Sequence, residues 1–319
     1  MTNQHSTTDG RPLAEVDLPI IHFVLNTDCN AWALQAVSGS PGVCRFCYRE
    51  RNRVATDATT VIQVLDLLRA ESAANRIVFT GGDPLMPYDN HLEIALSHAA
   101  GVGFAVNVHT NGLLLRDRYD RLRDWVDVYS LAIDGPDAAT ADWFRGAGYF
   151  ARFTDNVALL TADRRTVAFN TFTAPASIGR LDEIASLILN VAARTRVEYW
   201  LISQYRPIGR ADGRKAEIYA YSAADFAAAV EQVRARIADV GIDLFGQPTR
   251  DATDPYPFRV WVLADGTVTV DLGSVGAPRN EVLGNALRDG FAPLVRSALA
   301  LRDATFDAPD AQRAHADGR

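Results

Sequence analysis

The amino-acid sequence predicts an α/β fold with a mainly parallel sheet, and two observations carry this prediction. Short runs of β-branched residues alternate with segments of helical periodicity along most of the chain. The chain has 319 residues, of which 48% are hydrophobic, so it can bury a sizeable core. Regular alternation of strands and helices implies parallel strands joined by right-handed crossovers.

The predicted elements form six successive strand–helix units. The strands are Pro19–Asn26, Arg76–Thr80, Gly103–His109, Asp127–Asp134, Thr166–Thr173 and Glu198–Gln204. The helices are Thr59–Ala70, His91–Ala100, Arg116–Trp125, Ala151–Leu160, Leu181–Val191 and Ala223–Val240. Six such units predict a (β/α)6 partial TIM barrel, in which the loops after the C-terminal ends of the strands form the active site.

The C-terminal part of the chain predicts a small α+β extension. Asp265-Gly266, between the apolar runs Phe258–Ala264 and Thr267–Leu272, is a strong hairpin signal, and a helix is expected near Phe291–Leu301. We expect this extension to cap the open bottom of the barrel or the substrate mouth. The predicted regions are an N-terminal tail (1–18), the barrel core (19–249), the extension (250–302) and a disordered tail (303–319).

Charge and hydropathy exclude several classes of protein. The net charge of −7, with both signs mixed along the chain, argues against a nucleic-acid-binding surface. No segment approaches the ~20 apolar residues that a membrane span needs. The first residues lack a signal-peptide pattern, so we expect a cytoplasmic protein. Three cysteines, an odd number, make a disulfide framework improbable.

All three cysteines lie in the loop after the first strand, where Cys29, Cys44 and Cys47 have the spacing Cys-x14-Cys-x2-Cys. Thiolates are the usual ligands of iron–sulfur clusters, and three of them leave one iron of a four-iron cluster without a protein ligand. An open iron can bind a substrate or cofactor, as an open zinc position does. The cysteines alone leave a zinc ion, completed by a His or Asp, as an alternative.

Polar motifs end the next three predicted strands. Thr80–Leu85 reads Thr-Gly-Gly-Asp-Pro-Leu, His109–Gly112 reads His-Thr-Asn-Gly, and Ile133–Pro136 reads Ile-Asp-Gly-Pro. Glycines let a backbone approach a ligand closely, and Asp83 is an acceptor suited to an ammonium group. Each motif alone is compatible with a turn. Together with the cysteine loop, they indicate one binding site at the C-terminal ends of four successive strands.

This ordered set of motifs resembles the radical S-adenosylmethionine (SAM) superfamily, in the branch of the molybdenum-cofactor enzyme that acts on GTP and the peptide-modifying enzymes. Tyr205–Gly209 extends the resemblance, which spans Pro19 to Ala211. It implies that Cys29, Cys44 and Cys47 bind three irons of a [4Fe–4S] cluster, while the amino and carboxylate groups of SAM chelate the fourth. The SAM contacts it implies are Phe46, Gly81, Gly82, Asp83, Pro84, Thr110, Asn111, Ser130, Asp134, Asn170, Thr171, Ile208 and Gly209.

The chemistry of the family is reductive cleavage of SAM to methionine and a 5′-deoxyadenosyl radical, which removes a hydrogen atom from the substrate. The cofactor performs the hard step, and the protein positions it. Such a cluster works at the low end of iron–sulfur potentials, so we expect a flavodoxin- or ferredoxin-type reductant as a partner.

The sequence departs from the family pattern in four places. The first cysteine gap has fourteen residues where three are common, and Asp83 stands where a glutamate is usual. Ala132 replaces a small hydroxyl residue, for which Ser130 on the same strand face could substitute, and Ala168 replaces a basic residue. The long cysteine gap is similar to that of some 7-carboxy-7-deazaguanine synthases, although their N-terminal Gln-Gly-Glu-Gly signature is missing.

The candidate catalytic residues lie near the ends of the fourth and sixth strands: Arg145, Gln204, Tyr205, Arg206 and Arg210. Arginines could grip a carboxylate or phosphate through paired hydrogen bonds. Trp200 is either a substrate contact or a core residue, Trp261 is interpreted as a core residue, and His109 as a hydrogen-bonded strand-end residue. The extension lacks cysteine, so no auxiliary cluster can be bound there by thiolates.

The leading hypothesis from the sequence is a radical SAM enzyme acting on a small molecule or a short peptide. Three alternatives remain open. They are ring contraction like that of the deazaguanine synthases, a non-catalytic zinc or iron–sulfur protein on the same scaffold, and an iron–sulfur protein that binds SAM without cleaving it.

Overall fold

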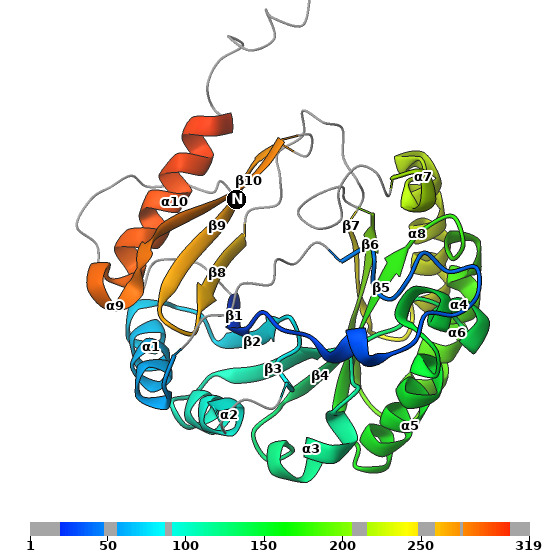
Figure 1. Ribbon diagram of the computed structural model, residues 1–319, viewed down its shortest axis with the longest axis horizontal. Helices are drawn as coiled ribbons and strands as arrows, with labels where there is room; N and C mark the ends of the chain where they lie inside the picture. The colour runs from blue at the N-terminus through cyan, green and yellow to red at the C-terminus, as the bar shows by residue number, and fades with distance from the viewer. Residues whose placement is uncertain are drawn as a thin grey trace, which may run out of the picture.

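A single curved sheet of ten strands dominates the computed structural model, which describes residues 20–47, 56–86, 91–205, 216–247, 259–274 and 277–306. The strand order is β10-β9-β8-β1-β2-β3-β4-β5-β6-β7. Strands β1 to β7 are parallel, β8 joins β1 in parallel, and β9 and β10 complete an antiparallel edge. Figure 1 shows the strands lining the inside of an open arc, so the barrel is partial.

The strands have the following bounds: β1 Ile20–Asn26, β2 Arg76–Gly81, β3 Ala105–Thr110, β4 Val128–Ala132, β5 Thr166–Thr173, β6 Val197–Gln204, β7 Asp243–Gln247, β8 Arg259–Leu263, β9 Thr267–Ser274 and β10 Ala277–Asn285. The helices are α1 Ala58–Glu71, α2 His91–Gly101, α3 Leu115–Leu122, α4 Ala138–Arg145, α5 Tyr149–Ala162, α6 Leu181–Ala192, α7 Ala216–Tyr219, α8 Ala223–Ile237, α9 Ala286–Asp289 and α10 Phe291–Phe306. Two short 3-10 helices are η2 Asn30–Ala33 and η3 Ile178–Arg180.

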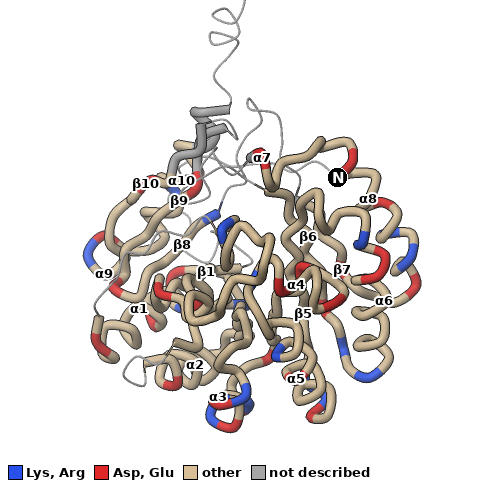
Figure 2. Tube along the Cα trace, turned by 45° about the vertical axis from the view of Figure 1, so that its right-hand side comes forward, with Lys and Arg blue, Asp and Glu red and all other residues tan. Residues whose placement is uncertain are grey.

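Charged residues are distributed over the outer helices without segregation by sign. Figure 2 shows acidic and basic positions interspersed along α3, α5 and α8. In the part of the chain that the structure describes, no helix combines the length and apolar character needed to cross a bilayer.

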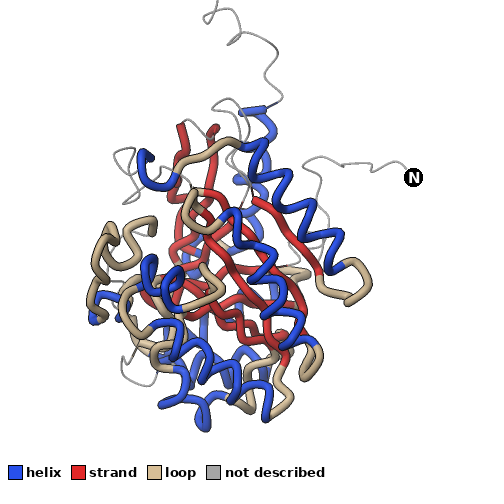
Figure 3. Tube along the Cα trace, turned by 90° about the vertical axis from the view of Figure 1, so that its right-hand side faces the viewer, coloured by secondary structure: helices blue, strands red, loops and turns tan. Residues whose placement is uncertain are grey.

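Alternation along the strands separates the core from the interior of the arc. On β2, Ile77 and Phe79 point outward and are fully buried against the helical layer, whereas Arg76, Val78 and Thr80 line a cavity on the inner face. The helices lie outside the strands in two views of the molecule (Figures 1 and 3). The inner face of the sheet is therefore available for a ligand site.

Helices α1, α4 and α8 begin at residues suited to N-caps. Asp57 accepts a hydrogen bond from the Thr60 amide at 2.9 Å, Asp137 accepts one from the Thr140 amide at 2.9 Å, and Ser222 caps α8 in the same way. Glu71, at the end of α1, accepts hydrogen bonds from the amides that begin α10. This contact holds the C-terminal helix against the first helix of the barrel.

The predicted fold class is confirmed, with differences in the extension. Strands β8 to β10 continue the sheet from β1, whereas the sequence led us to expect a cap on the barrel. The sequence analysis did not predict β10 or the short helix α4. The sequence analysis expected a disordered tail to begin at residue 303. Helix α10 continues to Phe306, so this expectation was wrong for residues 303–306. Residues 1–18 and 307–319 lie outside the described residues.

Candidate active site

A cavity of about 1140 Å³ occupies the inner face of the sheet and reaches both ends of the strands. Its upper end, beyond the C-terminal ends of the strands, is lined by Cys29, Cys44 and Cys47. Its lower end is lined by residues at the starts of strands, including Arg76 and Arg259. Ligand pockets commonly have ≈ 300–1,000 Å³, so this cavity has room for more than one bound group.

Hydrogen bonds hold the three cysteines in place, both within their loop and to β3 and α4. The Cys29 Sγ caps η2 by accepting the Ala31 amide at 3.5 Å and also accepts from Asn111 Nδ2 at 3.3 Å. The Cys44 amide donates to the Phe144 carbonyl at 2.8 Å, and the Cys47 amide donates to the Cys44 carbonyl at 3.0 Å. The loop therefore presents the thiols from two anchored segments.

Burial favours the protonated form of two of these thiols, Cys29 and Cys44. It raises the pKa of Cys29 to about 11, with a further contribution from the Asp83 charge, and the pKa of Cys44 to about 12. Metal binding replaces such protons, because thiolates are the ligands. Among the described residues, no three His, Cys, Asp or Glu side chains are gathered closely enough to hold a single metal ion.

Gly81 and Gly82 allow two backbone segments to touch. An added Cβ would lie 2.0 Å from the Asn26 carbonyl oxygen at Gly81 and 1.9 Å from the Asp28 carbonyl oxygen at Gly82. The Gly82 amide donates to Asn26 O at 3.0 Å, and the Asp83 amide donates to Asp28 O at 2.7 Å. The glycines therefore fix the start of the cysteine loop against the end of β2, and both also line the cavity.

The Asp83 carboxylate points into the protein. It is 1% exposed and accepts hydrogen bonds from the Thr110 hydroxyl, the Asn111 amide and the Leu85 amide, all at 2.7–3.0 Å. Burial raises the pKa of Asp83 to about 6, and these hydrogen bonds oppose that shift. Asp83 and Pro84 do not line the cavity. The Asp83 carboxylate therefore holds the end of β3 in place from outside the cavity.

An aromatic cluster surrounds the second half of the cysteine loop. Phe46 stacks on Phe172 with ring centroids 4.0 Å apart and contacts Phe144 and Tyr219 edge-on. Tyr205 is buried in the same cluster and does not line the cavity. The cluster places an aromatic wall beside Cys44 and Cys47.

Arg145, at the end of α4, lies over the rings of Phe46 and Tyr149 at 5.4 and 5.3 Å. It forms a buried ion pair with Asp134, which also accepts the Phe172 amide at 2.8 Å. Burial is the largest single influence and by itself would lower the pKa of Arg145, but the charge and hydrogen bond of Asp134, together with Tyr149 and Cys44, raise it overall. Arg145 lines the cavity, whereas Asp134 does not.

Some of the SAM and substrate contacts predicted on strands four to six lie together in the cavity wall. Asn170 Nδ2 donates to Ser130 Oγ at 2.6 Å, and Asn170 and Thr171 line the cavity. Gln204 lines it too, while its Nε2 donates to the Tyr221 carbonyl at 2.7 Å. Trp200 is buried in the core and donates to Thr171 Oγ1 at 2.8 Å. Arg206, Ile208, Gly209 and Arg210 lie outside the described residues.

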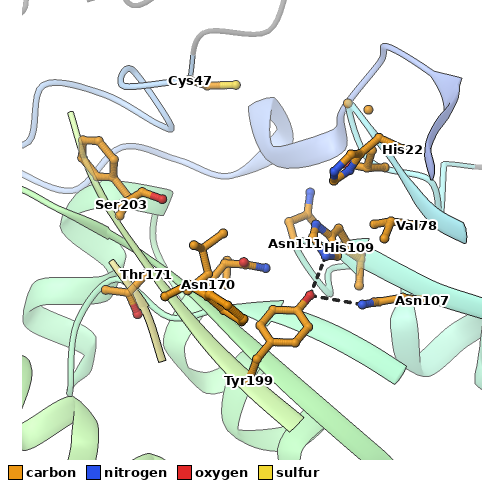
Figure 4. A pocket seen from close by; sticks show the side chains of 18 of the residues that line it. His22, Cys47, Val78, Asn107, His109, Asn111, Asn170, Thr171, Tyr199 and Ser203 are labelled. Atoms are coloured by element: carbon orange, nitrogen blue, oxygen red, sulfur yellow. Dashed lines mark hydrogen bonds between the residues drawn. The ribbon is translucent and has the colours of Figure 1, made fainter. Parts of the chain in front are cut away.

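The sequence analysis missed Tyr199, His22 and Asn107 in the cavity wall. The Tyr199 hydroxyl lies 2.7 Å from His109 Nε2 and 3.1 Å from Asn107 Nδ2 (Figure 4). Trp261, interpreted as core, is buried and also lines the cavity, with its ring 4.7 Å from that of His22. Polar residues at every second position of β3 are the signal that could have found Asn107.

Comparisons with known proteins relate part of this chain to one family. Residues 37–188 match the family model described as the radical SAM superfamily. A 7-carboxy-7-deazaguanine synthase of Bradyrhizobium diazoefficiens is 33% identical over 110 residues, covering 31% of this chain and 49% of the relative. An AdoMet-dependent heme synthase of Nitratidesulfovibrio vulgaris is 31% identical over 153 residues, covering 47% of this chain and 40% of the relative. The chain thus spans about half or less of these curated relatives.

Solved structures share the fold at low sequence identity. Streptococcus suis SuiB bound to S-adenosylmethionine has a TM-score of 0.64 and 13% identity, over 86% of this chain and 65% of SuiB. The enzyme anSMEcpe, bound to AdoMet and a peptide, has a TM-score of 0.65 and 12% identity, over 92% and 85%. The expected resemblance to the radical SAM superfamily is thus confirmed by the family match over residues 37–188, and the likeness to deazaguanine synthases is confirmed over 110 residues.

Proposed function

We propose that this chain cleaves SAM reductively at a [4Fe–4S] cluster and uses the resulting 5′-deoxyadenosyl radical to remove a hydrogen atom from a small molecule or a short peptide. The observation that carries the proposal is the set of three thiols at one end of a large cavity, next to the Gly81-Gly82 edge of β2. A flavodoxin- or ferredoxin-type protein would supply the electron. We place this activity in the cytoplasm, where thiols stay reduced.

The donor set fits a cluster with one open iron. Cys29, Cys44 and Cys47 would hold it, and the chain contains no fourth cysteine to close the remaining position. Asn111 already donates to the Cys29 sulfur, as donors to cluster sulfurs do. When bound, the cluster would supply a low-potential electron, and its open iron would be available to the amino and carboxylate groups of SAM.

The cavity wall below the thiols fits a nucleoside. Asn170 Oδ1 is a buried acceptor without a hydrogen-bond partner among the described residues, and a ribose hydroxyl would satisfy it. The rings of Phe46 and Phe172 present aromatic surface beside Cys47, which suits stacking or edge contact with adenine. In this arrangement the role of the protein is to orient SAM and to exclude water from the inner face of the sheet.

The experiment is anaerobic reconstitution with iron and sulfide, followed by SAM and dithionite. We expect about four irons and four sulfides per chain and release of 5′-deoxyadenosine. Cys44→Ala should lose both, whereas Ser297→Ala, on the exposed face of α10, should keep both. About one zinc and no sulfide would favour the non-catalytic alternative, and an intact cluster without 5′-deoxyadenosine would refute SAM cleavage.

Ring contraction is a second candidate function, favoured by the identity of 33% with a 7-carboxy-7-deazaguanine synthase. Incubation of the reconstituted protein with the pterin substrate of those enzymes tests it. Formation of the contracted ring would support this function, and its absence alongside active SAM cleavage would exclude it.

A further inference from the structure

Tyr199 reaches across the interior of the arc, from β6 to β3. Its hydroxyl contacts Asn107 and His109 on β3 and also Ser130 Oγ on β4 at 3.2 Å (Figure 4). Burial raises the pKa of Tyr199, so the hydroxyl keeps its proton at neutral pH. The hydroxyl oxygen accepts from Asn107 Nδ2, and its one proton is donated to Ser130 Oγ or to His109 Nε2, according to the tautomer of His109.

This hydrogen bond fixes the orientation of the Asn107 amide. Its Nδ2 donates to Tyr199, which leaves Oδ1 as the free end of the group. Asn107 is 1% exposed and lines the cavity, yet its Oδ1 has no hydrogen-bond partner among the described residues. Buried polar atoms are nearly always paired, so this oxygen marks a place where a ligand donates.

The position of Asn107 separates this place from the predicted cofactor contact at Asn170. In the sheet register Asn107 lies level with Val128 of β4, whereas Asn170 lies level with Ala132. Four residues along a strand correspond to about 13 Å. The backbone of Asn107 is therefore well below that of Asn170, on the side away from the cysteines. Their side-chain amides lie closer together, because Tyr199 and Ser130 link them through contacts of 3.1, 3.2 and 2.6 Å. A second ligand at Asn107 would therefore lie directly next to a group bound at Asn170.

The neighbours of Asn107 define the chemistry of that ligand. Val78 is its partner on β2, and the His22–Trp261 ring pair continues the same level of the wall. Among the described residues that line the cavity, the only carboxylates are Glu198 and Asp243, near the starts of β6 and β7, and Glu198 is paired with Arg76. A cation would find no counter-charge beside Asn107, so a neutral donor fits this level.

We propose that Asn107 Oδ1 is the acceptor of a substrate-recognition site that takes a neutral N–H or O–H donor, such as an amide or lactam nitrogen, with Tyr199 as its positioning residue. The proposal rests on the proposed function, because it places the substrate below SAM in the same cavity. A site built around such an acceptor discriminates strongly against molecules that lack the donor.

The test is binding of 2-pyridone and N-methyl-2-pyridone, which share a ring and differ in the N–H donor. Ligand-observed NMR on the full chain should give about tenfold tighter binding of 2-pyridone. Asn107→Leu should abolish the difference, Asn107→Asp should retain it, and Tyr199→Phe should reduce it without changing the affinity of the N-methyl compound. Asn190→Leu, on the exposed end of α6, is the matched control and should behave as the wild type.

Equal binding of the two probes to the wild type, absence of 2-pyridone binding, or unchanged discrimination in Asn107→Leu would each overturn the proposal. The readout is binding and requires no turnover, so it separates this site from the chemistry. Discrimination without SAM cleavage would refute only the proposed function, and SAM cleavage without discrimination would refute only the recognition site.

Discussion

The side-chain amide of Asn111 donates a hydrogen bond to the Sγ of Cys29 at 3.3 Å, joining residues 82 positions apart in the chain. The same amide contacts Asn30 Oδ1 at 2.9 Å, and the Asn111 backbone amide is held by Asp83. The end of β3 thus presents a fixed donor to the first cysteine.

Removal of that donor should lower the reduction potential of the bound cluster. Hydrogen bonds to sulfur stabilise the reduced, more negative form. A bond worth about 1 kcal/mol corresponds to about 40 mV for one electron, so Asn111→Leu should shift the midpoint potential negative by about that amount. Anaerobic titration monitored by EPR measures it, with Asn190→Leu as the control. A potential equal to that of the wild type would show that the Asn111 amide does not tune the cluster.

Substitution of Gly81 or Gly82 by alanine should disrupt the contact between the start of the cysteine loop and the end of β2. The added Cβ at Gly81 or Gly82 would overlap a backbone oxygen at about 2 Å, which no side-chain movement relieves. We expect Gly82→Ala to cost about 3 kcal/mol or more of unfolding free energy in urea. Gly101→Ala, at the open end of α2, should be neutral or slightly stabilising. Equal stability of the two variants would contradict this account of the contact between the cysteine loop and β2.

Loss of Arg145 should leave Asp134 as an unpaired buried charge. Arg145→Met is expected to lower the unfolding free energy by about 3–5 kcal/mol. The double variant Asp134→Asn/Arg145→Met should recover part of this loss, because the asparagine still accepts the Phe172 amide. Arg288→Met, at an exposed ion pair, is the control and should change stability little. A single variant as stable as the wild type would show that Asp134 needs no partner.

The cap of α4 should contribute pH-dependent stability. Arg180 and the Thr140 amide hold the pKa of Asp137 below its usual value of 3.8. A lowered folded-state pKa gives stability that is present above the unfolded pKa and is lost as pH falls through the folded value. Asp137→Asn keeps a capping oxygen but loses the charge, so its deficit at pH 7 should be below about 1 kcal/mol. Urea denaturation at pH 7, 5 and 3 should show this deficit shrinking below pH 4; a constant deficit would exclude the ion pair as its cause.

The sequence predicted the barrel strands well because their alternation is regular. The predicted strand Thr166–Thr173 has the same bounds as β5, and α6 and the last predicted barrel helix begin where expected. The eight-residue helix α4 was missed because it follows the Gly135-Pro136 turn directly and is too short to show a clear period. β10 was missed because its polar and glycine-containing sequence has weak strand character.

The sequence predicted which residues gather near the site. It did not predict where their side chains point. The motif around Asp83 marked the end of β2, yet only the fold shows that its carboxylate faces Thr110 and Asn111. Tyr199 looked like an ordinary strand residue, because its contact with β3 depends on the curvature of the sheet. Local patterns carry no information about such long-range reach.

The cysteine loop is anchored near both cysteine segments and also between them, where the Gln35 carbonyl accepts the Ala147 amide at 2.7 Å and the Gly39 carbonyl accepts Trp143 Nε1 at 3.0 Å. The backbone near Cys29 is fixed to β2, and the Cys44 amide is fixed to the Phe144 carbonyl at the end of α4. Lengthening the chain between two fixed points costs little entropy, about 0.6 kcal/mol per doubling. The intervening residues also dock on α4 and the residues that follow it, so a loop of another length would keep the thiols in place only by replacing these contacts.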